Sequence, residues 1–399
     1  MSAFMSVFLI VCLAVLNQIG LKGSKMLVAL YAIELHASAF TIGLLVSMYA
    51  VFPLALAVYA GRYSDRVGVR RPMVLGSIGM CCSLLLPAAL PSLVSLFVSA
   101  ALVGIANIFF HVASHNLVGA LGAASERTRN FGTLSLGSAV SGMLGPVLVG
   151  FLIDRAGYGL SYYVLTAISI VPGLVLGACG SLVPHHVRGK PQAPQADGKV
   201  RDLLRMPRLR NTLLTSGIIL TGIDLFNFYM PIHGRAIGLS ASMIGVIVGM
   251  QAAAAFVVRL WMPRMSERFG EMRVLTWSLA MAGATYFLFP SFRHPFVLSA
   301  ISFLLGLGLG CGQPLSIILT YNHSPPGRSG EALGLRLTVN KFTQILVPVM
   351  FGSLGSAFGI LPIFWASGGL LLWGAINNAR HERQPAPAEE SAETGTRSG

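Results

Sequence analysis

The stretch Gly61-Arg-Tyr-Ser-Asp-Arg-Val-Gly-Val-Arg-Arg-Pro72 is a short polar break between two long apolar runs. Its two glycines permit a tight turn, and its one carboxylate, Asp65, lies among four arginines. A weaker copy follows 202 residues later, where Ser64, Asp65, Arg66, Gly68 and Arg71 fall on Ser266, Glu267, Arg268, Gly270 and Arg273. The same shift places Gly43 on Gly245, Gly132 on Gly334 and Pro146 on Pro348. The sequence therefore consists of two related halves.

Long apolar runs fill most of both halves. Of the 399 residues, 54% are apolar and only 11% are charged, whereas soluble proteins carry about 25% charged residues. A membrane-spanning helix needs about 20 apolar residues, and the runs that meet this need cover residues 5–33, 40–61, 72–90, 92–121, 131–153, 160–182, 210–233, 241–262, 273–290, 295–321, 332–357 and 360–379. The sequence predicts an all-α integral membrane protein with twelve transmembrane helices in two six-helix halves, as in many secondary transporters.

The polar breaks alternate in charge along the chain. The breaks after even-numbered helices, together with the central break and the tail, hold 20 of the 28 lysines and arginines. The odd-numbered breaks hold only Arg155, Arg235 and Arg293, and five basic residues lie inside helices. The positive-inside rule then places both termini in the cytoplasm. We expect the protein to lie in a bacterial-type inner membrane. The net charge of +14 is thus largely topological, and we expect no nucleic acid partner.

Composition also divides the chain into four parts. Residues 1–182 form the first six-helix half, and residues 210–379 form the second. The proline-containing break 183–209 is typical of a flexible cytoplasmic linker, and the polar tail 380–399 is expected to be disordered. The five cysteines lie in apolar runs without the spacing of a metal site or of a disulfide framework.

The break between the second and third helices resembles the GxxxDRxGRR signature of the major facilitator superfamily. The match rests on Gly61, Asp65, Arg66, Gly68, Arg70 and Arg71, and it departs from the signature at Val69. The resemblance implies that this loop is a gate that latches the cytoplasmic ends of the halves in the outward-facing state. Asp65 would then face the start of helix 11 near residues 331–336, where a helix N-terminus attracts a carboxylate.

Helix 5 carries a second pattern of small residues. Its members are Gly142, Gly145, Pro146 and Gly150. Small residues allow close helix packing in lipid, which is one interpretation of the pattern. The other is that the pattern resembles the antiporter motif of drug–proton exporters in the superfamily, although Val149 stands where that motif has a second glycine. This second interpretation favours export.

An ionisable residue inside a membrane helix costs free energy, so such a residue is a candidate for function. Asp224 in helix 7 is the only carboxylate deep in a predicted span, and Asn227 lies one turn further on the same face. Lys22 and Lys25 share one face of helix 1, and Lys22 corresponds to Asp224 under the 202-residue shift. In the superfamily helices 1, 4, 7 and 10 line the cavity, so we expect a Lys22–Asp224 pair that breaks on protonation or substrate entry. The alternatives are a purely structural pair and a Lys25 that snorkels to the outer surface.

Further polar residues are expected to line the same cavity. Helix 4 presents Asn107, His111 and His115 as one stripe, and the shift places Gln313 of helix 10 opposite His111. Histidine suits proton coupling, whereas a zinc site lacks an acidic or cysteine partner on this stripe. Lys341, with Gln344 one turn on, lies roughly 15 Å into helix 11. Arg259 and Arg336 lie about one turn from helix ends and are expected to snorkel.

The sequence therefore predicts a secondary transporter that exports a small organic molecule by proton antiport and alternating access. Asp224, His111 and His115 are the proton candidates, and the three cavity lysines favour an anionic metabolite, a siderophore or a drug. The alternatives are a proton-coupled uptake symporter for an organic anion and an uncoupled lipid-moving protein or transport-derived sensor. No nucleophile–base arrangement or metal signature indicates an enzyme, and neither a cofactor nor a metal is expected. We expect a monomer whose partners are substrate, protons and the lipid bilayer.

Overall fold

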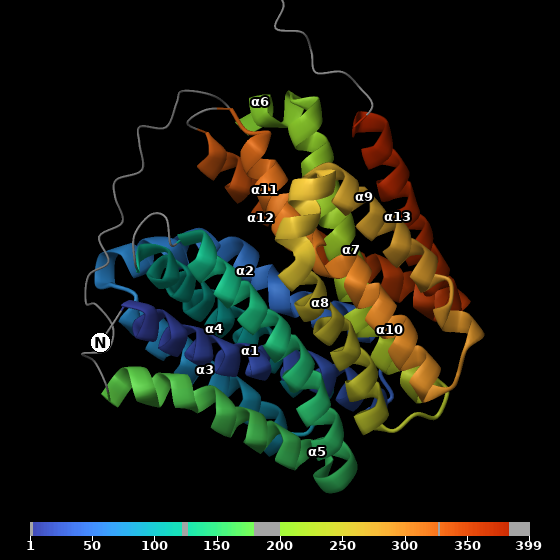
Figure 1. The fold of residues 1–399 in the computed structure, drawn as a ribbon. Helices are drawn as coiled ribbons and strands as arrows, with labels where there is room; N and C mark the ends of the chain where they lie inside the picture. The colour runs from blue at the N-terminus through green and yellow to red at the C-terminus, as the bar shows by residue number, and fades with distance from the viewer. Residues whose placement is uncertain (1–2, 122–126, 179–199, 326–327, 383–399) are drawn as a thin grey trace, which may run out of the picture.

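The structure is a computed structural model that describes residues 3–121, 127–178, 200–325 and 328–382. All regular structure in these residues is helical. The first half contains four single helices and one long helix that folds back on itself (Figure 1). These are α1 (Ala3–Glu34), α2 (Ala39–Val67), α3 (Arg70–Ala89), α4 (Leu93–Ala120) and α5 (Arg127–Ala178).

The second half begins with a short helix that lies before its first long one. Its elements are α6 (Val200–Arg205), α7 (Pro207–Ala236), α8 (Ala241–Phe269), α9 (Glu271–Tyr286), a 3-10 turn η3 (Phe289–Ser291), α10 (Pro295–Gly310), α11 (Gly312–Asn322), α12 (Ser329–Phe358) and α13 (Leu361–Glu382). The end of the predicted linker is thus helical, while residues 183–199 lie outside the described residues. Of the predicted tail, residues 380–382 complete α13, and 383–399 lie outside the description.

The predicted spans correspond to these helices with two differences. Helices 5 and 6 run together as α5, whose direction reverses at Gly157, where a φ of 77° favours glycine. Helix 10 is divided at Cys311 into α10 and α11. Eight helical stretches in the described part of the chain are long and apolar enough to cross a membrane. One of them, Pro295–Asn322, comprises α10 and α11, and α5 is long enough to cross twice. The helix order is consistent with twelve crossings in all.

The short connections define two opposite faces of the bundle. One face carries the connections 35–38, 90–92, 237–240 and 287–294 and the Gly157 turn, and we call it the odd-loop face. The opposite face carries residues 68–69, the start of α5 and the start of α12, and we call it the even-loop face. Both halves run from the even-loop face to the odd-loop face in α1 and α7, as a parallel repeat requires.

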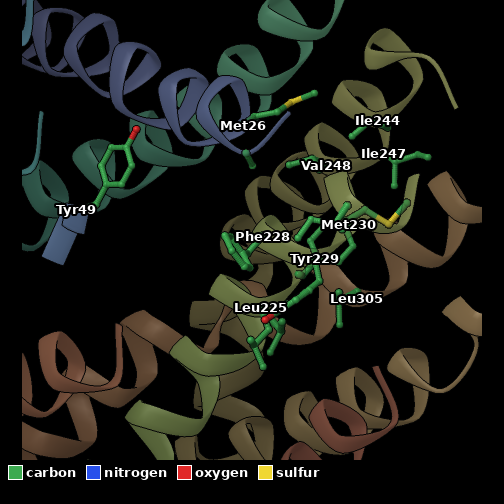
Figure 2. Close-up of a cluster of buried hydrophobic side chains, with 14 of the residues drawn as sticks. Met26, Tyr49, Leu225, Phe228, Tyr229, Met230, Ile244, Ile247, Val248 and Leu305 are labelled. Carbon is green, nitrogen blue, oxygen red and sulfur yellow. The ribbon is translucent and has the colours of Figure 1, made fainter. Parts of the chain in front are cut away.

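The two halves pack against each other through α5 with α8 and α2 with α12. One buried apolar cluster joins the halves, because Met26 of α1 belongs to the same cluster as Phe228 of α7 and Val248 of α8. Figure 2 shows these side chains together at the junction. Near the odd-loop face the contact is tight, since a Cβ on Gly43 would overlap the carbonyl oxygen of Pro348. Toward the even-loop face, a Cβ on Gly334 would meet nothing within 4 Å.

Candidate transport site

A chain of four polar side chains crosses the junction between the halves. Lys25 Nζ on α1 lies 4.0 Å from Asp224 Oδ1 on α7. Gln344 Nε2 on α12 donates to Asp224 Oδ2 at 3.1 Å, and Lys341 Nζ donates to Gln344 Oε1 at 3.0 Å. The side chains of Lys25 and Asp224 are 25% and 19% exposed, so this pair is partly solvated. The arrangement ties one helix of the first half to two helices of the second.

The predicted Lys22–Asp224 pair is replaced by the Lys25–Asp224 pair. Side chains on a helix lean toward its N-terminus, so the ammonium group of Lys25 reaches back along α1 to the level of Asp224. Lys22 remains within electrostatic reach of Asp224, Lys25 and Lys341. Lys25 therefore does not snorkel to the surface. Asn227, predicted beside Asp224, donates instead to the carbonyl of Ile223 on its own helix at 2.8 Å.

The two histidines of α4 contact each other. The His115 and His111 rings lie 4.0 Å apart, and His115 Nδ1 is 2.9 Å from the His111 carbonyl oxygen. His111 is within electrostatic reach of Lys22 and Lys341. The side-chain oxygen of Asn107 is buried and has no hydrogen-bond partner among the described residues. No group of three His, Cys, Asp or Glu residues in the described part of the chain is placed to hold a metal ion.

Two arginines that were expected to snorkel are bonded inside the protein. Arg336 is 3% exposed and donates to Gln313 Oε1 at 2.7 Å and to Ser316 Oγ at 2.8 Å. Arg259 donates to the carbonyl oxygens of Gly310 at 3.0 Å and Ser135 at 2.8 Å, and the second bond joins α8 to α5. The expectation was wrong because it considered only depth. The polar pair Gln313 and Ser316, one turn apart on helix 10, was the signal for a buried donor.

The predicted gating loop connects α2 and α3 on the even-loop face. Gly68 ends α2 with a φ of 83°, and Arg70 donates to the carbonyl oxygens of Leu176 and Gly177 at the end of α5, both at 2.7 Å. Arg66 and Arg71 are exposed and line, with Arg70, a cavity of about 630 Å³. Gly61 has open space beside it, and the Asp65 side chain lies outside the described part of the structure.

The helix 5 pattern lies where α5 crosses two other helices. A Cβ on Gly145 would lie 2.9 Å from the backbone nitrogen of Gly23 in α1, and one on Gly142 would lie 3.1 Å from the Ala252 Cβ in α8. A Cβ on Gly150 would overlap the Ala241 carbonyl oxygen at the start of α8. These contacts agree with the interpretation that the glycines allow close helix packing.

These features define a class of protein. An all-helical bundle of two repeated halves, with charged side chains at the junction between them, is typical of a multi-pass membrane transporter. Comparison with known proteins gives the family: the sequence model of the Major Facilitator Superfamily matches residues 10–240 and again residues 212–398. The chain belongs to this superfamily and is a transport protein rather than an enzyme.

Named relatives extend this assignment. Multidrug resistance protein MdtG of Citrobacter koseri is 23% identical over 364 residues, which cover 87% of each chain. The uncharacterized MFS-type transporter YuxJ of Bacillus subtilis is 23% identical over 324 residues, which cover 79% of this chain and 81% of that one.

Solved structures share the fold at low identity. A crystal structure of the peptide transporter POT matches with a TM-score of 0.80 at 15% identity, over 94% of both chains. A crystal structure of the nucleoside transporter NupG matches with a TM-score of 0.76 at 14% identity, over 94% of this chain and 99% of that one.

Proposed function

We propose that this transporter exports a small organic molecule by proton antiport, with Asp224 as the proton carrier. The observation that carries the proposal is the position of Asp224 between the halves, held by Lys25 from one side and Gln344 from the other. Protonation removes the charge that both partners address. The contact between α1 and α7 then weakens, and the halves are free to rock around the site.

The charge around Asp224 supports an anionic or chelating substrate. Lys25 pairs with this carboxylate, Lys341 is linked to it through Gln344, and Lys22 lies within electrostatic reach of it. The site therefore keeps a positive balance when Asp224 is ionised, and more so when it is protonated. An anionic metabolite, a siderophore or an acidic drug complements such a site, and His111 lies within electrostatic reach of Lys22 and Lys341.

Two arguments support the export direction. Relatives of the chain carry the name multidrug resistance protein, and the small-residue pattern of α5 resembles an antiporter motif. A positive site serves uptake of an organic anion by symport equally well, so the direction of proton movement decides between the two. The distribution of basic residues supports a cytoplasmic even-loop face and an inner-membrane location, and we take the monomer as the transporting unit.

The test is substrate-induced proton movement in proteoliposomes that contain the full chain. Anionic metabolites, siderophores and drugs are added to one side while a trapped dye reports pH. Proton movement opposite to the substrate supports antiport, and movement in the same direction makes the protein an importer. Asp224→Asn should abolish proton movement, while the matched variant Lys22→Gln should weaken substrate affinity and leave proton movement intact. Proton movement that survives Asp224→Asn would remove Asp224 from the mechanism.

A further inference from the structure

The two halves touch at two places on the odd-loop face, and the 202-residue shift relates one place to the other. At the first, α5 meets the N-terminus of α8, and at the second, α12 meets the N-terminus of α2. Ser38 and Ser240 are the N-cap residues of α2 and α8, and each has a φ of −67° and a ψ of 159°. The same backbone arrangement is therefore built twice.

A glycine allows the close approach at each place. A Cβ on Gly352 would lie 3.0 Å from the Ala39 carbonyl oxygen and 3.2 Å from the Phe40 Cα. A Cβ on Gly150, the equivalent residue, would lie 3.0 Å from the Ser242 Cα. Since the obstructing atoms belong to backbone, only a residue without a side chain brings the two helices this close.

One turn further along, the two places differ in charge. Asp154 accepts hydrogen bonds from the backbone nitrogens of Ala241 at 3.0 Å and Ser242 at 2.7 Å. At the equivalent position, Ser356 Oγ accepts one bond, from the Phe40 nitrogen at 3.0 Å. The first N–H groups of a helix have no partner within the helix and carry partial positive charge. A carboxylate satisfies two of them with charge-assisted bonds, whereas a hydroxyl satisfies one with a neutral bond.

We propose that Asp154 is the principal latch that holds the odd-loop face closed and sets the balance between the two access states, with Ser356 as a weaker latch of the same design. Asp154 and its bonding partners belong to different halves, so these bonds break whenever the halves separate on this face. A cap within one half would persist in both states and would not affect the balance. The latch rests on the alternating-access cycle proposed above.

The test measures conformation directly, in the full-length protein in lipid nanodiscs. Spin labels at Leu90→Cys and Ser291→Cys, in a background without native cysteines, report the separation of the halves on the odd-loop face. These positions are exposed and lie away from the latch. Asp154→Ser gives the carboxylate position the residue found at the other latch, and we expect the open-to-closed ratio to rise about tenfold, equivalent to about 1.4 kcal/mol.

The reciprocal change separates the latch from general damage. Ser356→Asp should lower the open-to-closed ratio, and the double variant Asp154→Ser with Ser356→Asp should restore a ratio near that of the parent protein. Glu34→Gln removes a negative charge at the end of α1 on the same face and serves as the matched control, with no expected shift. An Asp154→Ser ratio equal to that of the control, or a double variant that stays as open as Asp154→Ser alone, would overturn the latch.

The outcome is separable from that of the proposed transport mechanism. If Asp154→Ser opens the odd-loop face while Asp224→Asn leaves proton movement unchanged, the latch stands and the proposed coupling fails. If Asp224→Asn abolishes proton movement while the latch variants leave the distances unchanged, the coupling stands and the latch fails.

Discussion

A single methyl group added at Gly245 should force the odd-loop face open. A Cβ at this position of α8 would overlap the Pro146 carbonyl oxygen and lie 3.1 Å from its carbonyl carbon and 3.3 Å from the Val147 Cα. All three atoms belong to the α5 backbone, so the helices must separate rather than a side chain rotate. Overpacking of this kind costs about 1–3 kcal/mol. The improved helix propensity of alanine, about 1 kcal/mol, acts in both access states and cancels.

The penalty applies only to the closed state, so Gly245→Ala should raise the open-to-closed ratio by between about fivefold and about 140-fold, since about 1.4 kcal/mol is tenfold. Spin-label distances across the odd-loop face measure this ratio. Gly334→Ala is the matched control, because a Cβ there would meet nothing within 4 Å. The repeat-related Gly43→Ala should act like Gly245→Ala. Equal distance distributions for Gly245→Ala and Gly334→Ala would refute the reasoning.

Three further outcomes are expected. Asn378→Ala should lower the unfolding temperature in detergent, because two buried α7 donors lose their shared acceptor at about 1–3 kcal/mol each, while Ser353→Ala at an exposed site should not. Burial alone would raise the pKa of Asp154, but its hydrogen bonds from the start of α8 outweigh this effect and lower the pKa below the usual 3.8. The closed state should therefore keep its stability above about pH 4 and lose it only as pH falls further, with no such loss in Asp154→Asn by the distance measurement. Arg336→Lys should also lower the unfolding temperature, because one ammonium cannot reproduce the guanidinium bonds; unchanged melting would contradict its buried role.

The pH effect on Asp154 is a local one. Asp154 lies between the predicted spans 131–153 and 160–182, three residues before the Gly157 turn of α5, and it is exposed. Arg155 follows Asp154 in α5, and Tyr158 lies within electrostatic reach of Asp154, Glu34 and Arg235. Tyr158 accepts a bond from Arg235 of α7 at 3.1 Å, so that arginine is already engaged. Asp154 and Glu34 are the carboxylates of this group, and Glu34→Gln distinguishes their contributions.

Hydrophobic length, charge alternation and the internal repeat predicted the helical architecture because each is a property of single spans. A span must satisfy its backbone within itself and bury an apolar surface in lipid, whatever its neighbours are. The 202-residue shift then related the halves, and the motif between Gly61 and Pro72 identified the superfamily. Helices 5 and 6 still reverse direction at Gly157, within the predicted break between them, although α5 continues through this turn.

The partners of individual side chains were harder to predict from the sequence, because they depend on helix rotation and on the direction in which side chains lean. Equal depth suggested Lys22 as the partner of Asp224, but the lean of lysine toward the helix N-terminus gives that place to Lys25. Depth also suggested that Arg336 snorkels, but a partner on a neighbouring helix keeps it buried. The contact of Asp154 with α8 joins different halves and left no local pattern in the sequence.

The repeat itself indicates where function resides. Lys341 and Arg336 of α12 correspond by the shift to Ala139 and Leu134 of α5, so these two charged positions of the second half are apolar in the first, and Lys22 of α1 corresponds to the oppositely charged Asp224 of α7. A backbone plan shared by both halves serves packing, and its glycines recur at equivalent places. A titratable site needs asymmetry, because two equal carboxylates or two equal lysines facing each other would repel rather than pair. The same reasoning applies to the two latches of the odd-loop face. If both carried carboxylates, the closed state would be held more firmly and opening would be slower. One strong and one weak latch keep the two access states closer in free energy, as a transport cycle requires.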